Sequence, residues 1–337
     1  MSTQGPSPAL FFDTISAYHR TEALRAAIEL DLFTLIAGGQ RTATQLASAC
    51  QASPRGVRIL ADYLAILGFL RKHDDQYELS PDAAVLLNRQ SPAYLGGTVD
   101  FLLTPKLREC FQHLTAAVRR GGTAVSDEGT VSHDNPIWVA FARAMGPLMQ
   151  VPARLLAELL GGDVQQPLRV LDVAAGHGLF GIAVAARFPQ AHITALDWPN
   201  VLAVAAENAR RAGVSERHAL RPGSAFDVDW GGPYDVVLLT NFLHHFDLPT
   251  CAKLAAKAHA ALAPNGRALT LEFIPNPDRI SPPETATFAL TMLATTAQGD
   301  AYTFTEYQQV FAQAGFARSE FHVLPPTTQQ AVVSYKS

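Results

Sequence analysis

The stretch Leu168-Arg-Val-Leu-Asp-Val-Ala-Ala-Gly-His-Gly-Leu-Phe-Gly181 joins a strongly apolar segment to a glycine-rich turn. Residues 168–173 are predicted to form a buried strand, and a helix is predicted over 182–187. The glycines have the spacing G-x-G-x-x-G, which permits a tight turn and a close approach of the backbone to a ligand. The start of the following helix offers free N–H groups to that ligand. This order of elements indicates an α/β fold with a nucleotide site.

The rest of the second half continues the alternation of strands and helices. A helix is expected over 200–212. The further strands are expected over 192–197, 234–240, 267–273, 317–323 and 331–335, the last two as an antiparallel pair. Such an alternation is typical of a mostly parallel, Rossmann-like sheet with right-handed crossovers. Asp197 ends the second strand, where a carboxylate can accept two hydrogen bonds from ribose hydroxyls. The glycines alone would also fit an ordinary tight turn, so the nucleotide prediction depends on the whole series.

The first half has a mostly helical character. Apolar residues between positions 14 and 37 recur at helical spacing. A short helix is predicted to begin at Thr44, and a second one at Ser53-Pro54, because serine favours the cap and proline the first turn. The segments 69–72 and 76–79 are expected to pair as a hairpin. Two helices followed by a hairpin form a winged helix-turn-helix.

This winged-helix module raises the alternative of a DNA-binding regulator that senses a nucleotide. Residues 41–80 hold five basic and four acidic residues, which gives a net charge of +1. A duplex-binding face usually carries a clustered basic stripe. The charge pattern therefore favours a packing or dimerisation role for the module over DNA binding.

The composition is that of a globular protein. The chain has 337 residues, of which 48% are hydrophobic and 17% charged, with a net charge of −4, and the length suggests two domains. No stretch approaches the ~18 apolar residues of a membrane span, and the N-terminus shows no signal-peptide pattern. The three distant cysteines fit neither a disulfide framework nor a C-x-x-C metal site. We expect a cytoplasmic protein without a membrane or nucleic-acid partner, divided into 1–98, 99–164 and 165–337, with a natural boundary in the Gly- and Pro-containing segment 161–167.

The identity of the nucleotide depends on Asp172. This carboxylate lies inside the first strand, four residues before Gly176, where a nicotinamide-binding strand usually has an apolar residue. A carboxylate beside the glycine turn would attract an ammonium group and repel a pyrophosphate. S-adenosylmethionine carries such an ammonium and NAD does not. The sequence therefore favours S-adenosylmethionine, with a nicotinamide-dependent oxidoreductase as the alternative.

Five motifs then recur in a recognisable order: Val170-Leu-Asp-Val-Ala-Ala-Gly-His-Gly178, Ala195-Leu-Asp-Trp-Pro199, Pro222-Gly-Ser-Ala-Phe-Asp227, Asn241-Phe-Leu-His-His-Phe-Asp247 and Leu262-Ala-Pro-Asn-Gly266. Together they resemble the class I S-adenosylmethionine-dependent O-methyltransferases, in the bacterial and plant small-molecule group of caffeate and acetylserotonin enzymes. The resemblance covers nearly the whole chain. It implies a seven-stranded Rossmann-like methyltransferase domain, preceded by a mostly helical winged-helix dimerisation domain, and therefore a homodimer that serves secondary metabolism.

The resemblance also implies positions for the cofactor, whose product is S-adenosylhomocysteine. Asp172, Gly176 and Gly178 would line the methionine part, and Asp197 would bind the ribose. Further cofactor-binding positions are Trp198, Ser224, Ala225, Phe226, Thr240 and Asn241. The adenine stretch of the family usually reads Gly-Asp-Met-Phe, so Ser224 replaces the acid that accepts from the adenine amino group. Phe226 keeps a ring that can pack against adenine.

The catalytic end is expected just past the strand 234–240. Methylation of a phenol needs removal of the hydroxyl proton, and an imidazole can take a proton near neutral pH. In the family the first histidine of a His-Asp-Trp or His-His-Trp stretch is the general base; this chain reads His244-His245-Phe246, so the base maps to His244. Glu272, 28 residues later, matches a family glutamate that would hold the imidazole in one tautomer. A solvent-facing strand-end residue is the alternative for Glu272.

The acceptor pocket is expected to involve Phe141, Met145 and Met292, from the segments 99–150 and 285–298, together with His245. Aromatic rings and methionines suit flat apolar ligands, and no cluster of metal-ligating residues indicates a metal. The family often has a second acid in Gly-x-Glu-Arg-Thr, where this chain has Ala301 preceded by Asp300. The expected reaction is methyl transfer to a hydroxyl of an apolar, aromatic metabolite. Transfer to nitrogen or carbon on the same fold is the alternative.

Overall fold

The computed structural model describes residues 5–127 and 137–337. The chain forms two compact units that part between Val99 and Asp100. The helical stretch up to residue 159 belongs to the second unit, because α10 (Ile137–Leu159) buries one face in the same apolar core as the sheet. The segment 161–167, predicted as a natural boundary, is therefore a connection inside this unit and not a border between units.

The first unit contains the predicted helix–helix–hairpin order. Its elements are α1 (Ala9–Ile15), α2 (Ala17–Glu29), α3 (Leu32–Ala37), α4 (Ala43–Ala49), α5 (Pro54–Ile66), β1 (Leu70–His73), β2 (Gln76–Leu79), α6 (Pro81–Leu86) and a 3₁₀ turn at Gly96–Thr98. Thr42 and Ser53 cap α4 and α5 with their hydroxyls. The stretch 14–37, with its helical spacing, is helical but divided among α1, α2 and α3, and the chain turns at Asp31, whose φ is +56°.

The second unit is built on a seven-stranded sheet of order β5-β4-β3-β6-β7-β9-β8. The strands are β3 (Leu168–Val173), β4 (Ala191–Asp197), β5 (His218–Pro222), β6 (Tyr234–Thr240), β7 (Leu262–Glu272), β8 (Arg318–Val323) and β9 (Gln330–Tyr335). Strands β3 to β7 pair in parallel, and β9 is antiparallel to both of its neighbours. The structure confirms the predicted α/β class and adds β5, an edge strand that the sequence pattern did not show.

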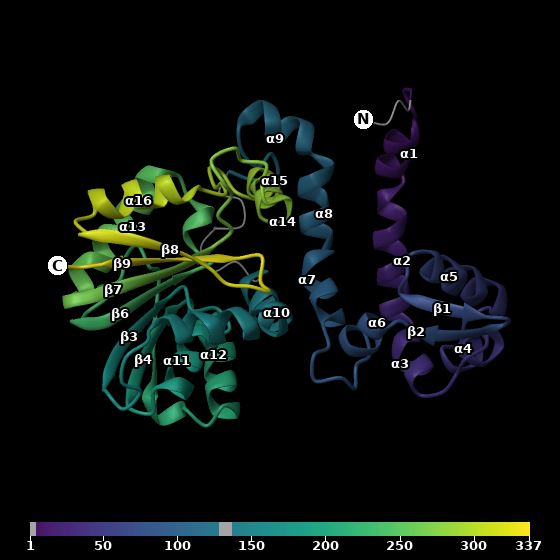
Figure 1. The fold of residues 1–337 in the computed structure, drawn as a ribbon, viewed down its shortest axis with the longest axis horizontal. Helices are drawn as coiled ribbons and strands as arrows, with labels where there is room; N and C mark the ends of the chain where they lie inside the picture. The colour runs from purple at the N-terminus through teal and green to yellow at the C-terminus, as the bar shows by residue number, and fades with distance from the viewer. Residues whose placement is uncertain (1–4, 128–136) are drawn as a thin grey trace. The chain divides into compact units, whose positions relative to one another are not determined.

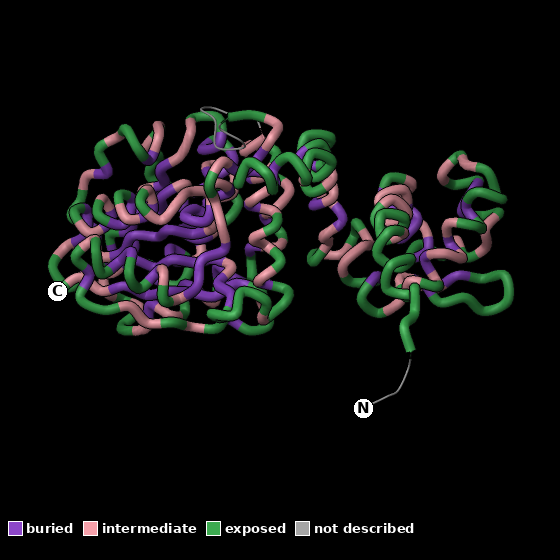
Figure 2. The backbone as a smooth tube through the Cα atoms, turned by 90° about the horizontal axis from the view of Figure 1, so that it is seen from above, coloured by how far each residue is buried: buried purple, intermediate pink, exposed green. Residues whose placement is uncertain are grey.

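Helices cover both faces of this sheet (Figure 1). One face carries α10, α11 (Leu179–Arg187) and α12 (Pro199–Arg211), and the other carries α13 (Leu248–Ala261) and α16 (Phe304–Gln313). The remaining helices of the unit are α7 (Val99–Leu102, which begins at the border), α8 (Pro105–Gln112), α9 (Leu114–Arg120), α14 (Pro283–Ala286) and α15 (Phe288–Thr295), with 3₁₀ turns at Ser215–Arg217 and Leu243–His245. Figure 2 shows the buried strands between these layers.

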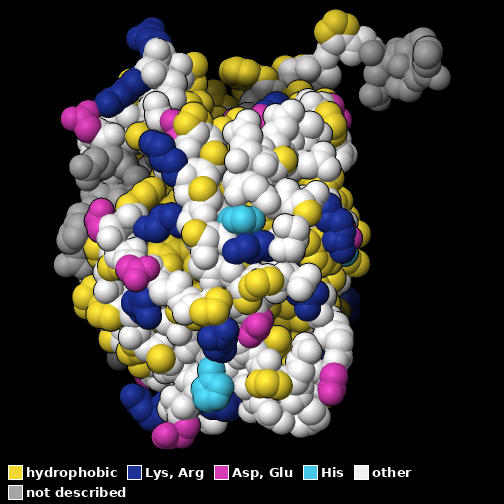
Figure 3. All heavy atoms as spheres, turned by 90° about the vertical axis from the view of Figure 1, so that its left-hand side faces the viewer, with side chains coloured by type: hydrophobic (Ala, Val, Ile, Leu, Met, Phe, Trp, Pro, Cys, Tyr) yellow, Lys and Arg dark blue, Asp and Glu magenta, His cyan; other side chains and the backbone are white. Residues whose placement is uncertain are grey.

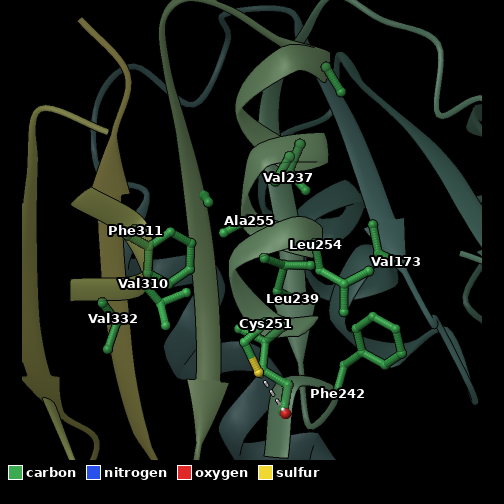
Figure 4. Close-up of a cluster of buried hydrophobic side chains, with 14 of the residues drawn as sticks. Val173, Val237, Leu239, Phe242, Cys251, Leu254, Ala255, Val310, Phe311 and Val332 are labelled. Atoms are coloured by element: carbon green, nitrogen blue, oxygen red, sulfur yellow. Dashed lines mark hydrogen bonds between the residues drawn. The ribbon is translucent and has the colours of Figure 1, made fainter. Parts of the chain in front are cut away.

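The core under α13 supports the loop that follows β6. Val237 and Leu239 of β6 pack against Leu254 of α13 in one apolar cluster (Figure 4). The Cys251 thiol donates to the Leu243 carbonyl oxygen over 3.2 Å, which ties the helix to that loop. The loop after β6 is therefore held from below by a close-packed core.

The strand order reverses at β3, which has β4 on one side and β6 on the other. Ligands of open α/β sheets bind at such a switch point, outside the carboxyl ends of the strands.

On the face shown in Figure 3, basic and acidic side chains are interspersed. Within the described residues, no helix has the length and apolar content needed to cross a membrane.

Candidate active site

A cavity of about 310 Å³ opens at the carboxyl ends of β3, β4 and β6. Its size is at the lower end of the range for small-molecule sites. Ten predicted site residues line it: Phe141, Gly176, Asp197, Trp198, Ser224, Ala225, Phe226, Thr240, Asn241 and His245. It is also lined by aromatic rings from the elements around it: Trp138, Phe180, Phe242 and Phe246. The lining is therefore mostly apolar and aromatic, with a few polar groups.

The glycine turn brings the backbone close to this cavity. Gly176 lines it with a left-handed φ of +57°. Gly178 has a different role, because a Cβ there would lie 2.9 Å from the Cβ of Ala205 in α12. A Cβ on Gly181 would lie 2.6 Å from Cγ2 of Ile193. The second and third glycines thus allow α11 to pack closely on its neighbours, and only the first contacts the cavity.

Asp197 holds the turn from the end of β4. Its Oδ2 accepts from the Gly176 N–H over 2.8 Å, and its Oδ1 accepts from the Trp198 N–H over 2.7 Å. Burial raises the pKa of Asp197 to about 6, against the lowering effect of these two hydrogen bonds. An ionised carboxylate offers about four acceptor positions. Two of them are therefore left for ligand hydroxyls.

Asp172 lies below the turn and is fully buried. Its Oδ2 accepts from the Gly181 N–H over 3.0 Å, while its Oδ1 has no partner among the described residues. Burial raises the pKa of Asp172 to about 7; the Gly181 hydrogen bond opposes this rise and the charge of Asp197 adds to it. Asp172 does not line the cavity itself. A cationic group next to the turn would stabilise both carboxylates, whereas a pyrophosphate would be repelled.

His177 is a lining residue that the sequence analysis did not single out. Its Nδ1 accepts from the Leu179 N–H over 3.2 Å. Burial lowers the pKa of His177 to about 4, so the ring is neutral at neutral pH. The middle position of G-x-G carries no sequence signal for such a role.

The loop after β5 forms another wall of the cavity. Ser224 Oγ accepts from the Phe226 N–H over 3.1 Å. The Phe226 ring lies edge-on to Phe246, with ring centroids 5.2 Å apart. The Ser224 hydroxyl accepts one bond locally, so its proton and one acceptor position are left to meet a ligand.

His244 and Glu272 form a buried pair at the ends of β6 and β7. His244 Nδ1 bonds Glu272 Oε2, and both side chains are at most 5% exposed. Glu272 Oε1 also accepts from the N–H groups of Phe242 and Leu243, over 3.0 and 2.9 Å. The solvent-facing alternative for Glu272 is therefore wrong. The two backbone bonds were not foreseen, and they fix the loop that carries the histidine.

His245 connects this pair to the cavity. Its ring lies 4.3 Å from the His244 ring and 5.2 Å from Trp138 between centroids. Burial, and then the charge of His244, lower the pKa of His245 well below its usual value. Its Nδ1 has no partner in the described part of the chain. His244 does not line the cavity, but it touches a ring that does.

Two predicted pocket residues, Met145 and Met292, do not line the cavity. Met292 is buried in α15. On α10, Phe141 faces the cavity, and Met149 contacts the lining residue Asn241 through a 3.5 Å contact from Asn241 Nδ2 to the Met149 sulfur. Met145 lies between these two positions on the helix. Helical spacing alone did not show which methionine reaches the site.

The segment of the missing second acid packs behind His244. The Asp300 N–H donates to the His244 carbonyl oxygen over 3.0 Å. A Cβ on Gly299 would lie 2.3 Å from that oxygen. The Asp300 carboxylate bonds Arg279 and is 42% exposed. It does not take the place of an acid beside the His244 ring. Among the described residues, no group of three or more His, Cys, Asp or Glu is arranged to hold a metal ion.

Comparisons with known proteins agree with this geometry. Residues 111–317 match the O-methyltransferase domain, and residues 12–89 match the O-methyltransferase dimerisation domain. The tetracenomycin polyketide synthesis 8-O-methyl transferase TcmO of Streptomyces glaucescens is 30% identical over 89% of this chain and 88% of its own. Acetylserotonin O-methyltransferase of Mus musculus is 30% identical over 91% and 83%.

A solved structure extends the likeness to the whole chain. A Nostoc punctiforme protein assigned to the O-methyltransferases is 53% identical, with a TM-score of 0.95 over 98% of this chain and 100% of its own. These matches confirm the predicted resemblance and exclude the oxidoreductase and regulator alternatives as the chain's family. The chain belongs to the O-methyltransferase family, whose methyl donor is S-adenosylmethionine.

Proposed function

We propose that this enzyme methylates a hydroxyl of an apolar, aromatic small molecule, with His244 as general base and Glu272 as the residue that orients it. The observation that carries the proposal is the buried His244–Glu272 pair, one ring away from an aromatic-lined cavity. The names of two relatives, of tetracenomycin polyketide synthesis and of acetylserotonin methylation, support an aromatic acceptor from secondary metabolism.

The residues at the glycine turn fit the methyl donor. The unpartnered Asp172 oxygen suits an ammonium group, and the free acceptor positions of Asp197 suit ribose hydroxyls. Ser224, Ala225 and Phe226 form the adenine wall. When bound, S-adenosylmethionine supplies a methyl group on a sulfonium, and transfer to oxygen leaves S-adenosylhomocysteine. Gly176, Trp198, Thr240 and Asn241 complete the cofactor site, whereas Gly178 allows the close packing of α11 on α12.

The proton leaves through His244. Its Nδ1 is held by Glu272, so Nε2 is the nitrogen that accepts the proton of the acceptor hydroxyl as the oxygen forms its new bond to carbon. The Glu272 carboxylate then balances the charge of the imidazolium. This arrangement contributes a factor of about 10² to 10⁴ to the rate. Alignment of the two reactants in a closed site contributes the larger part.

The acceptor is held by the remaining walls of the cavity. Phe141 and Trp138 pack edge-on at 5.7 Å between centroids, and His245 lies against Trp138. A neutral His245 adds a hydrogen-bonding group without adding charge. This wall favours a flat, uncharged ring with one or more polar substituents.

We also propose that the enzyme is a homodimer through its first unit. Large apolar side chains of α1 and α2 are exposed in a single chain: Leu10, Phe11, Phe12, Ile15 and Tyr18. Exposed apolar patches of this kind mark interaction surfaces, and the match to a dimerisation domain supports the same role. Sedimentation velocity that gave a monomer at micromolar concentration would contradict it.

The test of the reaction is a methylation assay on a panel of phenols with labelled donor. His244→Ala is expected to lower turnover on the best acceptor by about 10²- to 10⁴-fold, while S-adenosylhomocysteine affinity changes less than about threefold. His192→Ala, an exposed histidine at the opposite end of β4, is the matched control and should keep full turnover. Full turnover by His244→Ala would exclude it as the base.

A further inference from the structure

The loop 223–230, which contains the proposed adenine wall, is held by one lysine on the side opposite the cavity. Lys257 of α13 donates from Nζ to the carbonyl oxygens of Ala225, Phe226 and Val228, over 2.7, 2.8 and 3.2 Å. An ammonium group has three hydrogens. All three are therefore used on one short loop, 29 to 32 residues away in the sequence.

Other hydrogen bonds hold the start and the end of this loop. Residues 223–230 form neither strand nor helix, but the Asp227 and Val228 N–H groups donate to the Ser224 carbonyl oxygen, and Arg221 and Tyr234 donate to the carbonyl oxygens of Asp229 and Trp230. For the carbonyl oxygens of Phe226 and Val228, between these points, the donor is Lys257. The Trp230 indole N–H also donates to the Ala225 oxygen, over 2.9 Å. The Lys257 ammonium lies 5.3 Å from the centroid of the same indole ring. Lys257 and Trp230 together fix the carbonyl side of the loop, while Ala225 and Phe226 line the cavity.

The charge of Lys257 suits this role. Burial lowers the pKa of Lys257, and the nearby carboxylates of Asp227 and Asp229 oppose that lowering. The three carbonyl acceptors around Nζ also favour the protonated form. Hydrogen bonds from a charged donor are stronger than those between neutral groups.

We propose that Lys257 is a positioning residue for the methyl donor: it holds the 224–228 loop in the conformation that receives adenine. The inference rests on the proposed function, because it takes Ser224, Ala225 and Phe226 as the adenine wall. Without the ammonium, the carbonyl groups of Phe226 and Val228 lose their donor, that of Ala225 keeps only the Trp230 indole N–H, and the loop samples more conformations. The ligand must then order the loop as it binds, which reduces affinity.

This role predicts a specific kinetic pattern. His244 and Glu272 are held by their own hydrogen bonds, so chemistry after binding does not depend on Lys257. Lys257→Met keeps the apolar stem and removes the ammonium. The S-adenosylhomocysteine Kd and the KM for the donor are expected to rise about tenfold. The kcat at saturating donor and the KM for the acceptor should change less than about twofold.

The experiment compares four chains in three measurements. The wild type, Lys257→Met, Lys257→Arg and Lys253→Met are titrated with S-adenosylhomocysteine, assayed for both substrates, and followed by hydrogen exchange of amides 223–230 without ligand. Lys253 is an exposed lysine on the same helix, and its variant should behave as wild type. Lys257→Arg restores donors and should recover most of the affinity. Lys257→Met should exchange these amides faster.

Several results would overturn the inference. Wild-type affinity and wild-type exchange in Lys257→Met would show that the three hydrogen bonds do not position the loop. A loss of kcat at unchanged donor KM would place the effect in chemistry and not in binding. If Lys257→Met does not fold, Lys257→Gln, which has fewer donors, is used instead. It must show a smaller rise in the S-adenosylhomocysteine Kd and the donor KM, with kcat nearly unchanged. A wild type that binds no S-adenosylhomocysteine would overturn the proposed function itself, whatever the exchange result.

Discussion

Two buried carboxylates at the same edge of the sheet differ in how completely the chain satisfies them. Glu272 of β7 accepts from two backbone N–H groups with Oε1 and pairs with His244 through Oε2. Asp172 of β3 accepts one backbone bond with Oδ2, and its Oδ1 has no partner in the described residues. Both side chains are 0% exposed, so solvent does not account for the contrast.

The difference separates a part of the site that is already assembled from a part that needs a ligand. An unpaired charge in a protein interior is costly, and a buried acid without a partner responds by holding its proton more tightly. That is the state of Asp172, with its raised pKa of about 7. The Glu272 carboxylate has its partners before any substrate arrives. The proposed base, His244, is thus oriented in advance, and we propose that a cation completes the cofactor site.

The largest effect on turnover should come from replacing Glu272, the carboxylate whose two oxygens both have partners. Glu272→Gln keeps the shape but removes the charge that orients and balances His244. Turnover on the best phenol is expected to fall about 10²- to 10⁴-fold. A steady-state assay at saturating donor measures it. A variant that kept full turnover would show that Glu272 serves only to hold the loop through Phe242 and Leu243.

The two proposed catalytic residues, His244 and Glu272, should act as one unit. Residues that share one function are strongly non-additive when they are replaced together. Adding Glu272→Gln to His244→Ala is therefore expected to lower turnover by no more than about threefold below His244→Ala alone. Independent, multiplying losses in this double-mutant cycle would show that the pair does not work as proposed.

The unpartnered carboxylate of Asp172 should make binding of the methyl donor depend on pH. Below about 7 Asp172 becomes protonated, and a neutral acid no longer attracts the ligand ammonium. The affinity for S-adenosylhomocysteine should therefore weaken as the pH falls from 8 to 6, by up to about tenfold per pH unit below the pKa. Titration calorimetry at pH 8, 7 and 6 measures this. The Asp172→Asn variant should show a flatter profile, and a wild-type Kd that is constant over this range would contradict the assignment.

The same carboxylate should cost stability when no ligand is bound. The pKa of Asp172 is raised from 3.8 to about 7 in the folded chain, so the unfolded chain releases this proton first as the pH rises. The contribution of Asp172 to the free energy of unfolding therefore falls between pH 4 and 7, and the loss is complete above 7, at a few kcal/mol. Thermal unfolding of ligand-free Asp172→Asn should lack this fall.

The exposed Asp75→Asn is the matched control for that experiment and should follow the wild type at every pH. If the melting temperatures of wild type and Asp172→Asn differed by the same amount at pH 4.5 and pH 8, Asp172 would not titrate in this window. That outcome would remove the electrostatic argument that Asp172, at the carboxyl end of β3, needs a bound cation as its partner.

The sequence predicted the parts of the fold that carry strong local signals. Buried apolar strands such as 168–173 and 234–240, and the helix that begins at Ser53-Pro54, lie where the pattern placed them. The edge strand β5 was missed because its five residues show neither a regular alternation of polarity nor a β-branched side chain. The break at Asp31 was also missed, since no glycine or proline marks it.

The site was predictable wherever a motif fixes both residue and place. Asp172, Asp197, His244 and Glu272 all lie at the carboxyl ends of their strands, as the motif order required. Lys257 could not be found in this way, because nothing around it in the sequence shows that it reaches a loop about 30 residues earlier. Tertiary packing also decided that Met149, not Met145, contacts the cavity wall. Sequence motifs therefore identify the proposed reacting and binding groups, whereas the residues that hold them in place are recognised only in the folded chain.

The measurement that tests the central contrast most directly is a side-by-side titration of Asp172→Asn and Glu272→Gln with S-adenosylhomocysteine at pH 8. Removing one partner of a buried charge pair costs about 2 to 5 kcal/mol, so Asp172→Asn is expected to lose about 30-fold or more in affinity. Glu272→Gln should stay within about threefold of wild type despite its low turnover. Equal losses in both variants, or unchanged affinity in Asp172→Asn, would contradict this account, in which the ligand completes the surroundings of Asp172 while the His244–Glu272 pair is assembled before the ligand binds.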